Sequence, residues 1–190
     1  DKALDYTIRA LKVREELDDK FGIANSLSNT GDIFNSKGDW DQALDYTMRA
    51  LEIHKEIDNR YGMNYTHQTL GNIYINKGNY KKALDSFESS LTMREESDQL
   101  GKGVGFHSMG LAYWYKKDYR KAIEYFERAV VIHRKISFQT NFFQLGTFTY
   151  LNLSYKKLGK EFDLSKVTSL IKSNDFELKD DNDFELNYRL

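Results

Sequence analysis

Residues 70–84 read LGNIYINKGNYKKAL, a stretch with a helical spacing of apolar residues that carries one glycine inside it and another just past its end. Related stretches begin at Thr30, TGDIFNSKGDWDQAL, and at Met109, MGLAYWYKKDYRKAI. A glycine in a helix interior costs roughly 1 kcal/mol relative to alanine. The recurrence of the pattern therefore requires a structural reason for each glycine, and that reason decides the fold.

The two glycines of this stretch have separate predicted roles. We expect Gly78 to end a first helix, A, in the left-handed conformation, and Asn79 to cap a second, antiparallel helix, B. We expect Gly71 to face Ala83 across this hairpin, because two small residues let the helix backbones approach closely. The same arrangement recurs at Gly31 with Ala43 and Gly110 with Ala122, while Gly22, Gly62 and Gly101 recur at the predicted turn between hairpins.

The repeat extends over most of the chain. The segments ALDYTIRAL, ALDYTMRAL, ALDSFESSL and AIEYFERAV begin at Ala3, Ala43, Ala83 and Ala122, so the period is about 40 residues. Self-similarity at such a period indicates stacked supersecondary units. The absence of proline from all 190 residues suits a chain that is helical nearly throughout. We therefore predict an all-α fold of stacked antiparallel helix hairpins.

This register also predicts how the chain is organised. It gives one array over residues 1–172, and then an acidic loop and the start of a further helix over residues 173–190, where NDFEL occurs twice. The array comprises helix B of an incomplete unit at 1–18, hairpins at about 21–58, 61–98 and 102–137, and a degenerate hairpin at 140–172. In the last hairpin, Asn152 and Leu164 stand where the glycine and alanine belong. Because the chain begins within a helical pattern and without methionine, we interpret it as a segment of a longer protein.

The recurring residues resemble a known family. The spacing of Leu70–Gly71, Tyr74, Gly78, Tyr80, Ala83 and Phe87 resembles the tetratricopeptide repeat, and the resemblance covers about residues 1–172. The period exceeds the 34 residues usual in that family, and the frequent proline after helix B is absent. The chain is thus similar to the long-repeat subclass of LGN/Pins adaptors, kinesin light chains and bacterial Rap-type regulators. The resemblance implies a right-handed α-α superhelix, or solenoid.

Composition and motifs argue against several other functions. The net charge is −1, from 28 basic and 29 acidic residues, and no basic stripe recurs along the A helices, so nucleic-acid binding is not expected. No apolar run approaches the roughly 18 residues of a membrane span. We predict no metal, cofactor or catalytic site. Cysteine is absent and the four histidines lack the spacing of metal ligands. The segment GKGVG at Gly101 is not a P-loop. Acidic pairs recur with the repeat, which argues against a unique catalytic acid–base pair.

The resemblance also implies a binding site. In the tetratricopeptide family the A helices line a concave groove that holds an extended peptide or a partner's helix. Carried onto this register, the groove residues are Asn25, Ser28 and Asp32 in the first unit, Tyr65, Gln68, Asn72, Ile75 and Asn76 in the second, His107, Leu111, Trp114 and Tyr115 in the third, and Lys156 and Lys157 in the fourth. The groove is expected to pass from a polar end, through an aromatic middle, to a basic end.

Two interpretations of the aromatic middle stay open. Trp114 and Tyr115 either form a pocket for an anchor side chain of the partner, with Asn72 and Asn76 bonding a peptide backbone, or only fill gaps between A helices. Gln68 and His107 stand where a chaperone-type carboxylate clamp needs lysine or arginine, so an acidic C-terminal tail is not the expected ligand.

These observations predict a non-catalytic protein–protein interaction scaffold that binds a peptide or helix within a larger regulatory or signalling protein. The lack of cysteine and of a signal-peptide pattern favours a cytoplasmic location. The alternative is a self-association module that forms a homo-oligomer through the ends of the solenoid. Helix 1–18 lacks an A partner, so we expect Leu4, Ile8 and Leu11 to be uncovered.

Overall fold

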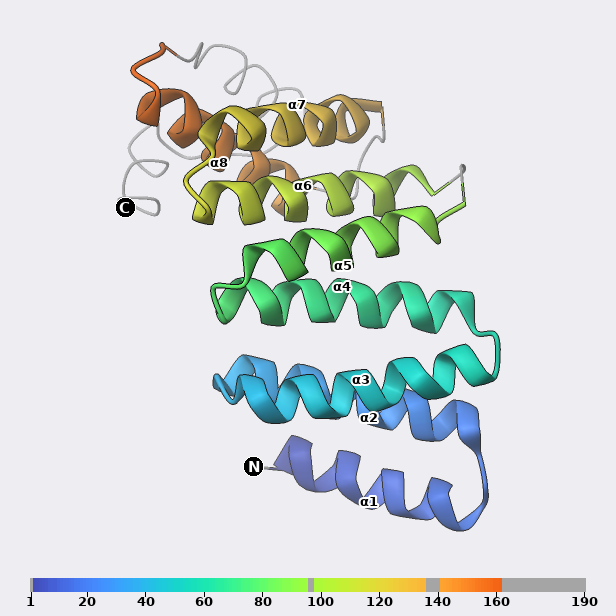
Figure 1. Cartoon of the computed structure of the whole chain (residues 1–190). Coiled ribbons are helices and arrows are strands. Elements are labelled where there is room, and N and C mark those ends of the chain that lie inside the picture. Colours follow the sequence, from blue (N-terminus) through green and yellow to red (C-terminus); the bar gives the residue numbers. More distant parts are fainter. Residues whose placement is uncertain (1, 96–97, 136–140, 162–190) are drawn as a thin grey trace, which may run out of the picture.

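The computed structural model describes residues 2–95, 98–135 and 141–161, which fold into helices stacked in sequence order (Figure 1). The helices are α1 (Lys2–Glu16), α2 (Lys20–Lys37), α3 (Trp40–Glu56), α4 (Arg60–Asn76), α5 (Tyr80–Thr92), α6 (Gln99–Tyr115), α7 (Tyr119–Lys135) and α8 (Asn141–Lys157). Each packs against the next as an antiparallel hairpin, with α1 at one end of the stack and α7 and α8 at the other. The prediction of an all-α solenoid of helix hairpins is confirmed.

The helices divide into two sets. The A helices are α2, α4, α6 and α8, and each contacts the next A helix directly as well as its sequence neighbours. The B helices are α1, α3, α5 and α7. The B helix predicted to follow α8, with Leu164, and both NDFEL segments lie outside the described residues.

The turn inside each hairpin follows the prediction. Gly38 and Gly78 have φ angles of 80° and 72°, in the left-handed region that glycine enters without a Cβ clash. Asn79 accepts a hydrogen bond from the Lys82 amide at 3.2 Å and so caps α5. The α6–α7 hairpin makes the same reversal with Lys117, whose φ is 66°. A lysine there bears the strain that glycine avoids in the other two hairpins.

The glycines inside α2, α4 and α6 allow close approach between the helices of a hairpin. At Gly31 an added Cβ would lie 3.3 Å from the carbonyl oxygen of the predicted partner, Ala43, and closer still to Thr47 Oγ1. A Cβ on Gly71 would overlap the ring of Phe87, and a Cβ on Gly110 would lie 2.5 Å from the ring of Phe126. Both rings are fully buried. Ala83, the predicted neighbour of Gly71, belongs with Phe87 to a core cluster that also contains Met109 and Ala112 of the following hairpin. The space left by each glycine therefore holds the residue one helical turn beyond the alanine.

Gly22, Gly62 and Gly101 are not turn residues, and this part of the prediction is wrong. Each is the third residue of an A helix, where its amide donates to the side chain of the N-cap residue. The turns between hairpins use Asp18 and Asp58, with φ angles of 53° and 51°. The glycines are needed because a side chain from the preceding B helix, or from the residues just after it, covers each of them; these side chains are Arg14, His54 and Arg94.

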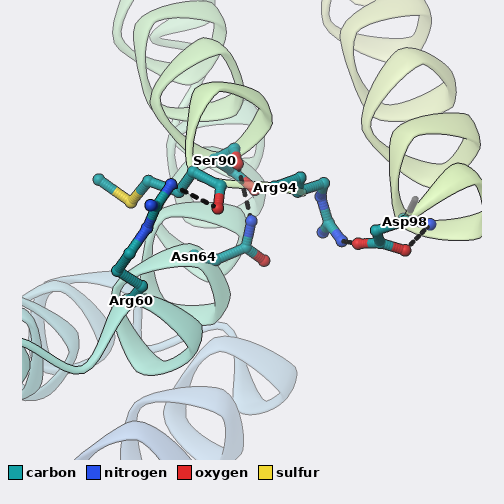
Figure 2. Close-up of polar contacts among 7 residues, drawn as sticks. Arg60, Asn64, Ser90, Arg94 and Asp98 are labelled. Atoms are coloured by element: carbon teal, nitrogen blue, oxygen red, sulfur yellow. Dashed lines mark hydrogen bonds and ion pairs between the residues drawn. The ribbon is translucent and has the colours of Figure 1, made fainter. Parts of the chain in front are cut away.

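Helix α5 is shorter than its equivalents, with 13 residues against 17 in α3 and α7. Asn64 of α4 donates to the Ser90 carbonyl at 2.7 Å, and Arg60 donates to the Met93 carbonyl at 3.3 Å (Figure 2). Side chains of α4 thus donate to carbonyls at the end of α5, in addition to the Met93 amide, which donates to the Ser90 carbonyl at 3.3 Å. Ala24 and Gly103 stand at the positions equivalent to Asn64 and carry no amide group.

Candidate functional site

Hydrogen bonds between side chains link α2 to α4 on the face formed by the A helices. Asp32 accepts hydrogen bonds from the Tyr65 hydroxyl and, at 3.0 Å, from Thr69 Oγ1. Asn76 Nδ2 donates to Asn35 Oδ1 at 3.0 Å. Partial burial and the hydrogen bond to the Asp32 carboxylate raise the pKa of Tyr65. Asp32, a predicted groove residue, is therefore engaged within the scaffold and fixes the position of Tyr65.

The same kind of link joins the later A helices. Gln68 Nε2 of α4 donates to Ser108 Oγ of α6 at 2.8 Å, and His107 Nδ1 of α6 lies 2.8 Å from Thr147 Oγ1 of α8. Sequence reasoning missed these contacts. The spacing could have predicted them, because the two residues of each linked pair lie 40 residues apart, which is one repeat.

Two predicted groove residues are buried by their neighbours. Ser28 is 4% exposed and donates to the Ala24 carbonyl of its own helix at 3.0 Å, and His107 is 9% exposed against Phe126 and Thr147. A partner cannot reach side chains covered to this degree. Ser28 and His107 support the face from beneath and do not form its surface.

The other predicted residues lie at or near the surface. Tyr65 and Tyr115 are each 41% exposed. The exposed polar members are Asn72, Asn76, Lys156 and Lys157, and the half-buried members are Asn25, Asp32, Gln68, Ile75, Leu111 and Trp114. Exposed amide and phenol groups thus alternate with apolar side chains across α4 and α6.

Trp114 joins α6 to α8. Its ring lies 5.2 Å from the Tyr150 ring and 5.3 Å from the Tyr115 ring, with edge-on geometry in both pairs. It also packs on the core cluster that contains Phe126 and Leu151. Burial and a hydrogen bond with the Tyr115 hydroxyl raise the pKa of Tyr150 to about 12. These contacts favour the gap-filling interpretation for Trp114 and leave Tyr115 as the accessible aromatic group.

The histidines are placed within the packing. His54 is fully buried at the α3–α4 junction, where its Nδ1 lies 3.2 Å from Asn59 Nδ2. Burial lowers the pKa of His54, and burial together with Lys55 lowers the pKa of His67. Across the described part of the chain, no three His, Asp or Glu side chains gather as metal ligands would. In the same residues, no helix has the length and apolar character needed to cross a bilayer.

Comparisons with known proteins agree with this geometry. Two stretches, residues 1–56 and 63–135, match the family model described as tetratricopeptide repeat. The fold is similar to the crystal structure of BtubC (BKLC) from P. vanneervenii, with a TM-score of 0.50 and 15% identity over 91% of this chain and 88% of that one.

A second similar structure is the APC/C hetero-tetramer Cut9-Hcn1, with a TM-score of 0.41 and 16% identity over 80% of this chain and 33% of that one. No curated protein sequence matches. The family model covers more than half of the 190 residues. The chain belongs to the tetratricopeptide repeat family.

Proposed function

We propose that this chain is a protein–protein interaction scaffold that binds a peptide or helix of its partner across the A helices. The observation that carries the proposal is the surface of α4 and α6. There Asn72, Asn76 and Tyr115 are exposed on helices that hydrogen bonds hold in register. A preorganised surface binds with little loss of conformational entropy.

The side chains of this surface suit a peptide ligand. The Asn72 amide can donate to and accept from a peptide backbone, while Ile75 and Leu111 offer half-buried apolar contact. Tyr115 supplies a rigid aromatic contact with a hydroxyl group, as is common at interfaces. Lys156 and Lys157, exposed at the end of α8, favour acidic residues at that end of the ligand.

The experiment is a peptide selection followed by variant binding. Peptides are selected from a displayed random library on the wild-type chain, and their affinity is then measured for an Asn72→Ala, Tyr115→Ala double variant. We expect at least tenfold weaker binding with unchanged helicity by circular dichroism. Trp40→Ala is the matched control, because Trp40 is an exposed aromatic residue on α3. Peptides that bind the double variant as tightly as wild type contradict the proposal.

A second candidate function, self-association, has one observation in its favour. Tyr6 and Val13 of α1 and Leu17, the residue after it, are 67%, 53% and 72% exposed and follow one stripe. The predicted patch is partly wrong, because Leu11 is buried against Leu27 and Ala50. Light scattering tests this candidate. Dimers that Leu17→Lys abolishes support it, and a monomer at high concentration contradicts it.

A further inference from the structure

A pocket of about 330 Å³ lies between α3, α4 and α5, away from the A-helix face. Leu70 and Tyr74 of α4, Met48 and Leu51 of α3, and Ser86 and Ser89 of α5 line it. Leu70 and Tyr74 lie opposite Asn72 and Asn76 around α4, since an α-helix turns once in 3.6 residues. The pocket therefore opens on the B-helix side of the solenoid. Its volume is at the small end of ligand sites, which span about 300–1,000 Å³.

The equivalent position one repeat earlier is filled by the chain itself. Tyr46 of α3 stacks on Phe34 of α2, with ring centroids 5.4 Å apart and planes 12° from parallel. The guanidinium of Arg49 lies 5.5 Å from the centre of the Tyr46 ring, and Arg49 also forms an ion pair with Asp45 at 3.6 Å. A tyrosine and an arginine, three residues apart on the B helix, thus fill this position in the first layer, by which we mean the hairpin of α2 and α3.

The position one repeat later is filled in the same way. Tyr125 of α7 stacks on Tyr113 of α6, with centroids 5.3 Å apart and planes 16° from parallel. The Arg128 guanidinium lies 5.3 Å from the centre of the Tyr125 ring and 3.9 Å from that of Phe106. The tyrosine–arginine pair is therefore the side-chain set that fits this position in the layers on either side of the pocket.

Serine replaces both members of the pair in the middle layer. In the register that aligns Ala43, Ala83 and Ala122, Ser86 stands at the tyrosine position and Ser89 at the arginine position. Both hydroxyls donate to carbonyls of their own helix, at 2.8 Å and 2.9 Å. They are thus occupied within α5, and the space of two large side chains is left open.

The replacement leaves two groups without the contacts that their equivalents make. The Tyr74 ring lies 5.4 Å from Lys82 Nζ and packs against the core cluster that contains Phe87, but among the described residues it stacks on no aromatic ring. The Asp85 carboxylate, equivalent to Asp45, forms no ion pair within the same residues. Lys82 does not exclude a ring here, because its equivalent Lys121 lies 5.2 Å from the Tyr113 ring in a layer where that ring is stacked.

We propose that this pocket is a second docking site, for a partner protein that inserts an aromatic side chain and an arginine about one helical turn apart. The ring stacks on Tyr74 as Tyr46 stacks on Phe34, and the guanidinium pairs with Asp85 as Arg49 pairs with Asp45. The rim carries Glu52 and Asp85 beside Lys55 and Lys82, so its charges balance. Selectivity therefore comes mainly from the aromatic ring.

The site is separate from the A-helix face of the proposed function. It uses the opposite side of α4, and a partner bound there leaves Asn72 and Tyr115 accessible. The Asn72→Ala, Tyr115→Ala double variant should therefore bind a pocket ligand as wild type does. This makes the failure of one proposal distinguishable from the failure of the other.

The test uses a capped tetrapeptide, acetyl-Tyr-Ala-Ala-Arg-amide, titrated into the full chain and followed by amide chemical shifts. We expect shifts at Tyr74, Ser86 and Ser89, at least tenfold weaker binding when alanine replaces the tyrosine, and a loss of a few fold when alanine replaces the arginine. The filling variant, Ser86→Tyr with Ser89→Arg, restores the pair of the neighbouring layers. It should remove the shifts and raise the melting temperature.

The outcomes separate clearly. No shifts in wild type, equal binding by the filling variant, or shifts confined to Asn72, Asn76 and Tyr115 on the opposite face overturn the proposal. If the filling variant does not fold, Ser89→Arg alone narrows the pocket mouth, and unchanged binding by that variant overturns the proposal too. Oligomers that Tyr6→Ser abolishes would make α1 of a second copy the occupant, because Tyr6 and Arg9 form the equivalent pair, and would overturn the assignment to a separate partner.

Discussion

Gly71 of α4 lies directly against the ring of Phe87 of α5, and this contact sets the spacing of the central hairpin. Phe87 is fully buried, so its ring cannot move aside for a methyl group. The glycine is thus required by a neighbour in the adjacent helix and not by its own backbone conformation.

Gly71→Ala should destabilise the fold in spite of the better helix propensity of alanine. The overlap with Phe87 costs about 1–3 kcal/mol as overpacking, against a gain of about 1 kcal/mol from propensity, so we expect a net loss of up to about 2 kcal/mol in urea unfolding. Gly146→Ala on α8 is the matched control, because the nearest atom to its Cβ would be His107 Cε1 at 3.7 Å. The control should be neutral or stabilising. Equal effects of the two changes would show that contact with Phe87 is not the cause.

Lys117→Gly should stabilise the α6–α7 hairpin. Lys117 has a φ of 66°, and the left-handed conformation costs an L-residue about 1–2 kcal/mol. We expect a gain of about 1 kcal/mol in the free energy of unfolding, measured by urea denaturation. Gly78→Lys makes the reverse change at the equivalent position and should destabilise by a similar amount. A destabilised Lys117→Gly variant contradicts this account of the turn.

The buried His54 should make stability depend on pH. Burial lowers the pKa of His54 in the folded state below its usual value of 6.5. The unfolded chain therefore binds the proton more tightly, so protonation favours unfolding, and stability present at pH 7 is lost as the pH falls below 6.5. We expect the melting temperature to fall between pH 7 and pH 5.5 by less in His54→Gln than in wild type. Identical slopes would mean that His54 does not titrate between the two states.

Asn64→Ala should loosen the end of α5. The change removes the donor to the Ser90 carbonyl, a hydrogen bond of 2.7 Å (Figure 2), and we expect a loss of about 1 kcal/mol. Hydrogen exchange should become faster at the last amides of α5 and remain unchanged in α2 and α3. Asn29→Ala, at an exposed site on α2, is the control. Unchanged protection of α5 would show that Asn64 does not hold this helix end.

The fold could be predicted from the sequence because its determinants are local and repeated. The hairpin turn at Gly78 and the apolar spacing within residues 70–84 need no knowledge of distant contacts. The contact of Gly71 with Phe87 was not predicted, for a geometric reason. Side chains tilt toward the N-terminus of their own helix, so Phe87 leans back over Gly71 from one turn beyond Ala83.

The candidate site was less predictable, because burial depends on neighbours a full repeat away. Helical spacing placed Ser28 and His107 on the same side of their helices as the exposed residues, but the packing around them covers both. Leu11 was expected at the surface and is covered by Leu27 and Ala50. The pocket between α3, α4 and α5 was not predicted either. Serine is common on helix surfaces, and Ser86 and Ser89 indicate an open space only once Tyr46 and Arg49 are known to fill the equivalent position.

If partners bind across the A helices, chemical-shift mapping with a library-selected peptide will show the contact residues themselves. We predict that the largest amide shifts fall on Asn72, Ile75, Asn76, Leu111 and Tyr115, with smaller ones at Lys156 and Lys157. Shifts confined to the B helices or to the exposed stripe of α1, with the A helices unperturbed, would contradict binding at this face.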